Sequence, residues 1–320
     1  MFVSWIRYHG RSEGLAAALQ VRAEFVAVGR LGQRWTAPLR YVVQGARTAW
    51  LLVRHRPRVL VVMAPPSALV ALGLLYQTLR RRPLLVDAHT NAVLGRGGAP
   101  RKVFLRLARH ARVTIVTTEA LGRVVAAHGV RTVVLHDPPF GEPAPDVGSA
   151  PAAARERPLL VMPSSWWSDE PLDELRRAAE ATPEVDIVLT GRPAGPLGDP
   201  ALWPPNVRLA GWLPDDDYRG LVVSATALIA LTTRAMTMQR AGYEALILGR
   251  ALVVSDSAVL REYFTQGAVF CRHEVDDMRR AFLEVAARHA ELASAMTHLR
   301  REKQDEFQAG LTTIRQAIAN

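Results

Sequence analysis

The stretch TTRAMTMQRAGYEALILGRALVVSD, residues 232–256, has the pattern of a helix followed by a strand, and it comes directly after another strand. An apolar run ends near Leu231, and a helical pattern extends from about Gln239 to Leu248. Gly249 stands where a helix commonly ends in a left-handed residue, and the β-branched run ALVVS follows it. The stretch therefore predicts one β-α-β unit of a parallel sheet.

The same alternation extends through the chain on both sides of this unit. Strands are predicted at MFVSWI, AEFVAVG, RVLVVMA, PLLVDAH, VTIVTT, TVVLHD, PLLVMPS, EVDIVLTG, NVRLAG, ATALIALT, RALVVSD and GAVFC. Helices are predicted to begin near Ser12, Pro38, Ser67, Pro100, Glu119, Asp169, Asp215, Gln239, Ala258 and Glu274. Several strands are apolar at successive positions, as expected where both faces of a sheet are covered. We therefore expect an α/β protein with two Rossmann-like, doubly wound domains facing a cleft.

The segment between Asp137 and Pro158 is rich in Pro, Ala and Gly and has no periodic apolar face. It predicts a linker over residues 141–157, between a first domain of residues 1–140 and a second of residues 158–290. A C-terminal helix is predicted within residues 291–320, from about Glu291 to Ile318, and it could cross back to the first domain. In such folds ligands bind at the carboxyl ends of the strands.

The positive charge is concentrated in the first half of the chain. Residues 1–140 contain 21 Lys and Arg against 5 Asp and Glu, whereas the remainder contains 19 against 25. Such a half suits an anionic membrane surface, a diphosphate-bearing substrate or nucleic acid. Arginine used only as a solvated surface residue is an equal alternative. The charge is not gathered in one motif, so we do not expect nucleic acid as a partner.

Three features favour a cytoplasmic protein. Cys271 is the single cysteine, which excludes a disulfide framework. The N-terminal segment has an early charge and no cleavage site, so a signal peptide is not expected. Residues 59–79 are uncharged and long enough to span a membrane, but Pro65 and Pro66 divide them. We expect a buried strand and a helix there.

Residues 242–256, GYEALILGRALVVSD, resemble the EA-x-x-x-G-x-P-x-V-x-S signature of family 4-like retaining glycosyltransferases of the GT-B fold. NVRLAGWLPDDDYRGLVVSATALIAL resembles that family's V-x-x-x-G strand and turn with the next helix and strand. EVDIVLTGR resembles its strand that ends in a glycine near the nucleotide, here Gly191. The resemblance is good over residues 158–290 and weak in the first half. It implies an acceptor-side first domain and a second domain that binds the nucleotide-sugar donor.

The residues around Glu244 are the expected donor site. The start of the predicted helix offers backbone N–H groups to phosphate, and Thr237 and Gln239 add side-chain donors. The resemblance implies that Glu244 binds the donor ribose, and Arg192 and Arg240 are the nearest cations for the diphosphate. The full set of expected donor-binding residues is Glu244, Thr237, Gln239, Arg240, Gly191, Arg192, Ser165 and Gly10.

The first half supplies the expected catalytic and acceptor-side residues. Asp87 and His89 are two apart in PLLVDAH, so they lie on the same side of an extended strand. A similarly placed His in the resembled family contacts the sugar near the reacting carbon, so we assign both to catalysis. Arg11 and Thr118 are the acceptor-side candidates. Ser12 is predicted to cap the first helix, with Glu13 in its first turn.

Three departures from the family pattern leave an alternative open. The Pro of the signature is Ala251, the position of a second common Glu is Met236, and the turn that often supplies an Arg and a Lys reads PSSWWSDEP. A non-catalytic binding or scaffold protein of the same fold would show such departures. Another nucleotide-sugar enzyme, such as an epimerase, would need an acid and base pair that we do not find.

The resemblance implies retaining transfer of a sugar from a UDP or GDP donor to a hydroxyl of a glycan, a lipid-linked sugar or a small molecule. No cofactor or metal is expected, because Asp215, Asp216 and Asp217 follow Pro214 at a helix start, where acidic residues favour the dipole. The basic half could dock on an anionic membrane leaflet at its inner face, with the helix of residues 67–79 at the interface.

Overall fold

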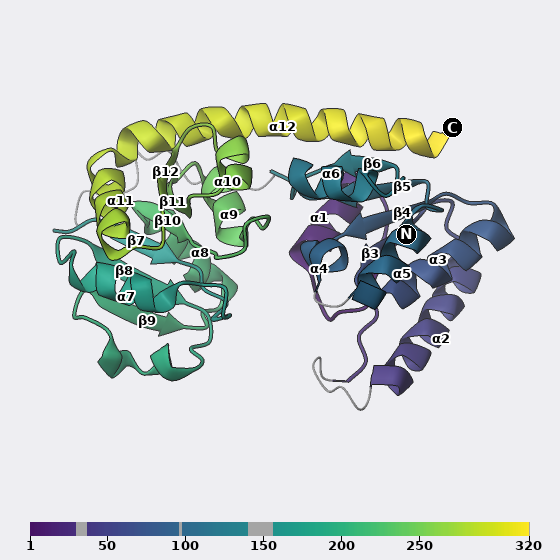
Figure 1. The fold of residues 1–320 in the computed structure, drawn as a ribbon, viewed down its shortest axis with the longest axis horizontal. Coiled ribbons are helices and arrows are strands. Elements are labelled where there is room, and N and C mark those ends of the chain that lie inside the picture. The colour runs from purple at the N-terminus through teal and green to yellow at the C-terminus, as the bar shows by residue number, and fades with distance from the viewer. Residues whose placement is uncertain (30–36, 96–97, 140–155, 320) are drawn as a thin grey trace. The chain divides into compact units, whose positions relative to one another are not determined.

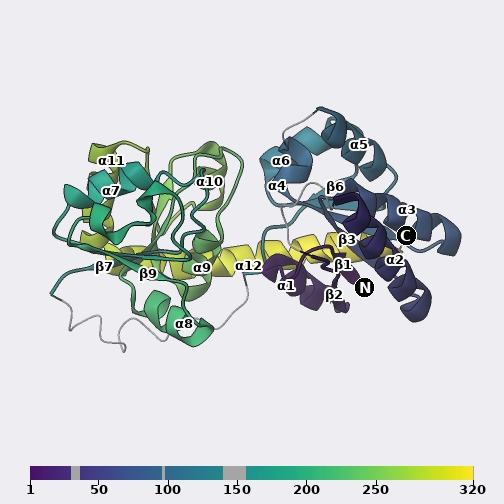
Figure 2. The ribbon, with the colours of Figure 1, turned by 90° about the horizontal axis from the view of Figure 1, so that it is seen from below.

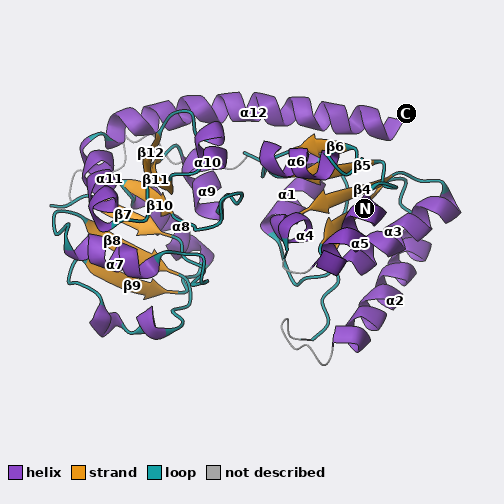
Figure 3. Ribbon diagram, in the orientation of Figure 1, coloured by secondary structure: helices purple, strands orange, loops and turns teal. Residues whose placement is uncertain are grey.

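The computed structural model describes residues 1–29, 37–95, 98–139 and 156–319. It consists of two compact units, one formed by residues 1–138 with 305–320 (unit 1) and the other by residues 139–304 (unit 2). Each unit contains one six-stranded parallel sheet with flanking helices (Figures 1 and 3). The predicted α/β architecture of two doubly wound sheets is confirmed. Most of the predicted linker, up to residue 155, lies outside the described residues.

The sheet of unit 1 has the strand order β2-β1-β3-β4-β5-β6. All six strands stand where the apolar runs predicted them: β1 Phe2–Ser4, β2 Ala23–Phe25, β3 Leu60–Ala64, β4 Leu84–Ala88, β5 Val113–Val116 and β6 Thr132–Val134. β3 and β4 are buried at every position, which explains why their residues are apolar without alternation, apart from Asp87 of β4. Since the strands are parallel, their carboxyl ends lie at one edge of the sheet and their amino ends at the other.

Helices cover both faces of this sheet. They are α1 Gly10–Ala18, α2 Ala37–His55, α3 Ser67–Arg80, α4 Thr90–Leu94, α5 Gly98–Ala108, α6 Glu119–Ala126 and the last part of α12 His289–Ala319. On one face, Leu15 of α1 and Leu311 of α12 pack with Phe2, Val61 and Ile115 (Figure 2 shows α1 beside β1 and β2). On the other, Gly73 lets α3 lie close to the sheet, because an added Cβ would stand 2.7 Å from Leu84 Cδ1.

The uncharged segment of residues 59–79 forms β3 and α3, and Pro65 and Pro66 lie between them, as predicted. In the described part of the chain, no helix is both long enough and apolar enough to cross a membrane.

The sheet of unit 2 has the order β12-β11-β10-β7-β8-β9. Its strands are β7 Leu159–Met162, β8 Asp186–Thr190, β9 Val207–Gly211, β10 Ala227–Ala230, β11 Ala251–Ser255 and β12 Ala268–Cys271. Its helices are α7 Leu172–Glu180, α8 Asp215–Ser224, α9 Arg240–Leu248, α10 Ala258–Tyr263, α11 Val275–Ala287 and the first part of α12. α7 and α11 belong to one core layer, and α9, α10 and the first part of α12 to the other.

Gly249 ends α9 in the left-handed conformation, with φ 64°, as predicted. The short helix α4 was not predicted. α7 begins three residues later than predicted, because the side chains of Asp169 and Glu170 are engaged in the loop before it.

The end of β8 lies against the turn that follows β7. Gly191 has φ +87°, and a Cβ placed there would lie 2.0 Å from the backbone oxygen of Ser164. The Trp166 indole nitrogen donates to the Thr190 oxygen at 3.0 Å and closes the same contact. Only glycine fits this close approach of two backbones.

Substitution of Gly191 by Ala is therefore expected to reduce the free energy of unfolding by about 3 kcal/mol or more, from steric overlap and strain together. Urea denaturation measures this. Gly220→Ala is the matched control, since α8 leaves open space around Gly220. The control should stabilise by up to about 1 kcal/mol. Equal stabilities for the two variants would contradict the close approach.

Candidate active site

Arg11 is the centre of a buried polar cluster at the carboxyl edge of the sheet in unit 1. Its side chain is 3% exposed, although it lies in the first turn of α1. Its Nη2 donates to Asp87 Oδ1 at 2.9 Å and to the Leu135 oxygen at 2.9 Å. Its Nη1 donates to Asp137 Oδ1 at 2.9 Å. One guanidinium thus joins α1, β4 and the chain that follows β6.

Asp87 is fully buried, and its carboxylate contacts the side chains of Arg11 and His89. Its Oδ1 takes the Arg11 contact, and its Oδ2 lies 3.2 Å from Nε2 of His89. Burial alone would raise the pKa of Asp87, but the charge of Arg11 and the contact with His89 hold that pKa below its usual range. Asp87 is therefore a carboxylate at neutral pH. It positions His89, whose side chain is 23% exposed, and has no exposed surface of its own.

His9 completes this cluster. Its ring lies 4.7 Å from the ring of His89, edge to face. Burial and the neighbouring His89 lower the pKa of His9 from 6.5 to about 4. His9 is therefore neutral at pH 7, and its Nδ1 accepts a hydrogen bond from the Ser12 backbone N–H at 3.3 Å.

The prediction that Ser12 caps the first helix is wrong. His9 is the N-cap of α1, and Gly10 is the first helical residue. The Ser12 hydroxyl instead accepts from Ser4 Oγ at 3.1 Å and is buried in the cluster. A histidine is an uncommon N-cap, so the sequence favoured the serine. Glu13 lies in the first turn, as predicted.

The hydrogen bond of the Thr118 side chain is made outside this cluster. Thr118 is 1% exposed, and its hydroxyl accepts from the Leu121 N–H at 3.2 Å as the N-cap of α6. Of the residues predicted in the first half, the structure therefore brings together Gly10, Arg11, Asp87 and His89, and gives Thr118 a capping contact. His9 and Asp137 were not predicted as members.

The start of α9 forms the second candidate site, at the carboxyl edge of the sheet in unit 2. Glu244 lies one turn into the helix, and Arg240 Nε donates to its Oε1 at 2.8 Å. The Tyr218 hydroxyl donates to its Oε2. Burial and the Glu244 carboxylate raise the pKa of Tyr218 far above its ordinary value, so this hydroxyl keeps its proton. Glu244 is thus held in place while remaining 16% exposed.

The other residues predicted near Glu244 surround the helix start. Gln239 is the N-cap of α9 and makes no side-chain capping bond. The hydroxyl oxygen of Thr237 is buried and has no hydrogen-bond partner among the described residues. The Arg240 side chain is 70% exposed. A hydroxyl without a hydrogen-bond partner beside a helix N-terminus suits the binding of an anionic ligand.

Glu170 fills the turn after β7, a contact that sequence reasoning missed. Its Oε1 accepts from Ser165 Oγ at 2.7 Å and from the Ser165 N–H at 2.9 Å. Its Oε2 accepts from the Trp166 N–H at 3.1 Å and from Ser164 Oγ. The hydroxyl of the predicted donor-binding Ser165 is therefore already engaged within the protein.

Neighbouring loops at this edge are joined by Asp169. Its Oδ2 accepts from Thr232 Oγ1 at 2.9 Å, and its Oδ1 lies 3.2 Å from Arg234 Nη2. The loop after β7 is thereby tied to the loop that leads from β10 into α9. Arg192 follows Gly191 and is exposed.

The three consecutive aspartates occupy the first turn of α8, as predicted from the dipole. In the described ranges, no group of three or more His, Cys, Asp and Glu side chains is arranged to hold a metal ion.

The low pKa of His9 predicts a pH-dependent stability. Between pH 6.5 and about 4 the unfolded chain binds a proton at His9 that the folded chain does not, so folding becomes less favourable as the pH falls through this range. Asn is a good N-cap and does not titrate. His9→Asn should therefore give a flatter decline of the unfolding free energy from pH 7 to pH 4. Equal slopes for the two proteins in denaturant titrations would rule out this role.

No protein-family model and no curated protein sequence matches the chain. Solved structures do match it. HepE of Anabaena, in complex with UDP and glucose, has a TM-score of 0.69 at 15% identity, covering 99% of this chain and 91% of its own. Sucrose-phosphate synthase of Thermosynechococcus elongatus has 0.69 at 13%, covering 99% and 98%. The lipopolysaccharide outer core galactosyltransferase WaaB has 0.65 at 13%, also covering 99% and 98%. The fold of this chain is therefore that of the GT-B glycosyltransferases.

Proposed function

We propose that the protein is a retaining, family 4-like glycosyltransferase that moves a sugar from a UDP- or GDP-sugar to an acceptor hydroxyl. One observation carries the proposal. At the N-terminus of α9 the Thr237 hydroxyl is buried without a partner, and Glu244 is fixed one turn further on. In the solved structures of HepE, which have the same fold, UDP and UDP-glucose are bound.

In this proposal, the donor diphosphate binds at the start of α9. Backbone N–H groups, Thr237 and the Gln239 side chain donate to phosphate oxygens, and the helix dipole favours the negative charge. Glu244 accepts two hydrogen bonds from the ribose hydroxyls. Tyr218 positions Glu244, because a carboxylate already held by one donor loses less freedom on binding.

The cations of the proposed diphosphate site are arginines. Arg240 lies at the helix start with an exposed side chain, and Arg192 follows the close turn at Gly191. Both can neutralise the leaving diphosphate, so the proposal includes no metal ion and no cofactor. The Ser165 hydroxyl can bind the donor only if it gives up its hydrogen bond to Glu170. Gly10, the first residue of α1, would offer its backbone N–H to the donor.

In the proposed reaction, the bond from the anomeric carbon to the diphosphate breaks and the acceptor oxygen bonds to that carbon on the same face. The acceptor proton leaves with the departing diphosphate, so no protein nucleophile is needed. In the proposal His89 contacts the donor sugar, and Asp87, itself held by Arg11, positions the His89 ring. We propose a glycan, a lipid-linked sugar or a small molecule as the acceptor. Arg11 and Thr118 would support the acceptor side indirectly, Arg11 by its contacts with Asp87 and Asp137 and Thr118 by capping α6.

Replacing Glu244 by Ala is expected to weaken UDP or GDP binding by 10- to 100-fold, since a charged acceptor of two hydrogen bonds is lost. Isothermal titration calorimetry measures the affinity, and hydrolysis of several nucleotide sugars identifies the donor. Glu180→Ala, at the exposed end of α7, is the matched control and should bind as the wild type does. Hydrolysis should also persist in EDTA.

A wild-type protein that binds neither UDP nor GDP would overturn the proposal. It would favour a non-catalytic scaffold of the same fold, which the sequence departures at Met236 and Ala251 also fit.

We also propose that the protein is cytoplasmic and docks on the inner face of an anionic membrane through α2. This helix buries two polar side chains and exposes several large apolar ones. Gln44 and Thr48 are buried and make hydrogen bonds to Val26 and Trp5. On the outer side, Leu39, Val42, Trp50 and Val53 are 61 to 68% exposed.

The spacing of these residues on α2 suits a membrane surface. Positions 39, 42, 50 and 53 fall on one narrow stripe at 3.6 residues per turn. Arg40, Arg47 and Arg54, spaced by seven, form a second stripe beside it. An apolar stripe with a tryptophan, bordered by cations, is complementary to acyl chains below negative headgroups. The sequence had placed this role on residues 67–79, where Leu69, Val70 and Tyr76 are buried and Leu75 and Leu79 are exposed, so that helix stays a second candidate for the contact.

Trp50→Gln should reduce the affinity for vesicles containing phosphatidylglycerol by about tenfold, because one large apolar side chain no longer enters the bilayer. Flotation with neutral and anionic vesicles measures this. Trp212 has the same exposed fraction, 62%, and lies in unit 2, so Trp212→Gln is the control. Equal flotation of the two variants, or no preference of the wild type for anionic lipid, would contradict docking through α2.

A further inference from the structure

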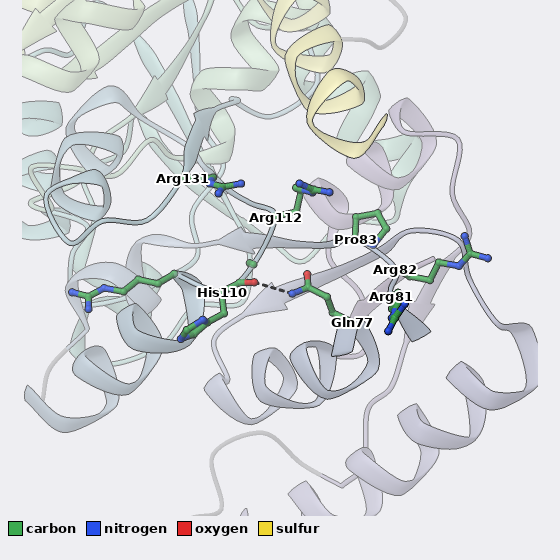
Figure 4. Close-up of a pocket in the computed structure, with 9 residues that line it drawn as sticks. Gln77, Arg81, Arg82, Pro83, His110, Arg112 and Arg131 are labelled. Carbon is green, nitrogen blue, oxygen red and sulfur yellow. Dashed lines mark hydrogen bonds between the residues drawn. The ribbon is translucent and has the colours of Figure 1, made fainter. Parts of the chain in front are cut away.

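A pocket lined by arginine lies at the amino edge of the sheet in unit 1, opposite the edge that carries Asp87 and His89. Its volume is about 280 Å³. Figure 4 shows the residues that line it. Pro83, Arg112 and Arg131 line it and directly precede the first residues of β4, β5 and β6. The five arginines of the pocket are Arg81, Arg82, Arg109, Arg112 and Arg131, and His110 is a further member.

The backbone of this pocket is fixed by hydrogen bonds. Gln77 Nε2 donates to the His110 oxygen at 2.8 Å, the contact drawn in Figure 4, and its Oε1 accepts from the Leu84 N–H at 3.1 Å. The Arg112 N–H donates to the Leu84 oxygen at 2.8 Å, and the Arg131 oxygen accepts from the Thr114 N–H at 2.8 Å. Two of the arginines therefore project from strand starts whose positions are set by the sheet, so the pocket exists before any ligand binds.

The positive charge of the pocket is not balanced nearby. Among the described residues, none of its five guanidinium groups forms an ion pair with an Asp or Glu. Between Glu24 and Asp137 the chain has 18 Lys and Arg, and its only carboxylates are Asp87 and Glu119. Asp87 is buried at the opposite edge, and Glu119 begins α6 after the carboxyl end of β5. A bound anion would therefore relieve mutual repulsion of the arginines that no ion pair among the described residues offsets.

A second basic pocket adjoins the first. Its volume is about 390 Å³, and it shares Arg109 with the first pocket. Arg101, Lys102 and Arg106 of α5 line it. The positive surface thus continues beyond one pocket, which suits a ligand with more than one negative charge.

Helix dipoles account for only part of this cluster. α3 and α5 end at this edge, and cations near a helix C-terminus are stabilised by the dipole. That explains Arg81, Arg82 and Arg109. Arg112 and Arg131 belong to no helix end, since each directly precedes a strand. Their convergence on the same cavity is what points to a ligand.

We propose that this arginine pocket is a second anion-binding site, which takes a phosphate-bearing group such as a diphosphate. Guanidinium groups bind phosphate through paired, charge-assisted hydrogen bonds. The phosphate belongs either to a soluble molecule or to a lipid headgroup. The site lies at the opposite edge of its sheet from the cluster around Arg11, and it does not depend on the proposed glycosyl transfer.

The test compares two double variants with equal loss of charge. Arg112→Gln with Arg131→Gln removes the two strand-start arginines. Arg22→Gln with Arg123→Gln removes two exposed arginines of unit 1 that line neither pocket. Calorimetric titration with pyrophosphate, in low salt and with UDP present to fill a donor site, measures binding of the soluble anion. Flotation with vesicles containing phosphatidylglycerol measures binding of the headgroup.

The pocket variant should bind pyrophosphate at least tenfold more weakly than the control variant, whose affinity should stay within about threefold of the wild type. A loss confined to flotation would identify the headgroup as the source of the phosphate. Equal behaviour of the two variants in both assays would overturn the proposal. Failure of UDP to bind would count against the glycosyltransferase alone, because the two variants are compared with each other.

Discussion

The contact of Arg11 with Asp87 is the constraint on which the carboxyl edge of unit 1 depends. Two charges out of water are costly unless each is paired and hydrogen-bonded, and here both conditions are met. The guanidinium also reaches Asp137 and the Leu135 oxygen, so α1, β4 and the chain after β6 are held by one side chain. His89 depends on this arrangement because its contact is the remaining oxygen of Asp87. An imidazole that is 23% exposed is thereby held by a fully buried carboxylate, which is how a rigid site is built on a parallel sheet.

The fold could be predicted because its constraints are local in sequence. Parallel strands covered on both faces are apolar at successive positions, as in all five residues of β3 and in four of the five residues of β4 and of β11, where Asp87 and Ser255 are the exceptions. Gly249 marked the end of α9, since a left-handed C-cap favours glycine wherever it occurs. Their two-residue spacing indicated that Asp87 and His89 lie on the same side of the chain, and the structure places their side chains 3.2 Å apart, with His89 directly after the last residue of β4.

The contacts that complete each site could not be predicted, because they join residues distant in sequence or depend on burial. Tyr218 is 26 residues from Glu244, and no pattern distinguishes it from any other tyrosine on an amphipathic helix. Ser12 has the better capping chemistry, but the burial of its hydroxyl against Ser4 leaves the capping to His9. Glu170 lies in a segment whose composition suggests a solvated loop, yet it is 7% exposed and accepts hydrogen bonds from two serine hydroxyls and two backbone N–H groups.

Glu170 also gives a physical reading of the departures from the family pattern. A turn without Arg or Lys supplies no cation to a diphosphate, and its buried N–H groups need an acceptor. The carboxylate of Glu170 meets that need within the chain. The negative charge of a diphosphate would then have to be neutralised at another place. At the start of α9, the buried hydroxyl of Thr237 has no hydrogen-bond partner among the described residues, and the side chain of Arg240 is exposed. In the proposed donor site, binding of a diphosphate therefore depends on the start of α9 and on how firmly Tyr218 holds Glu244.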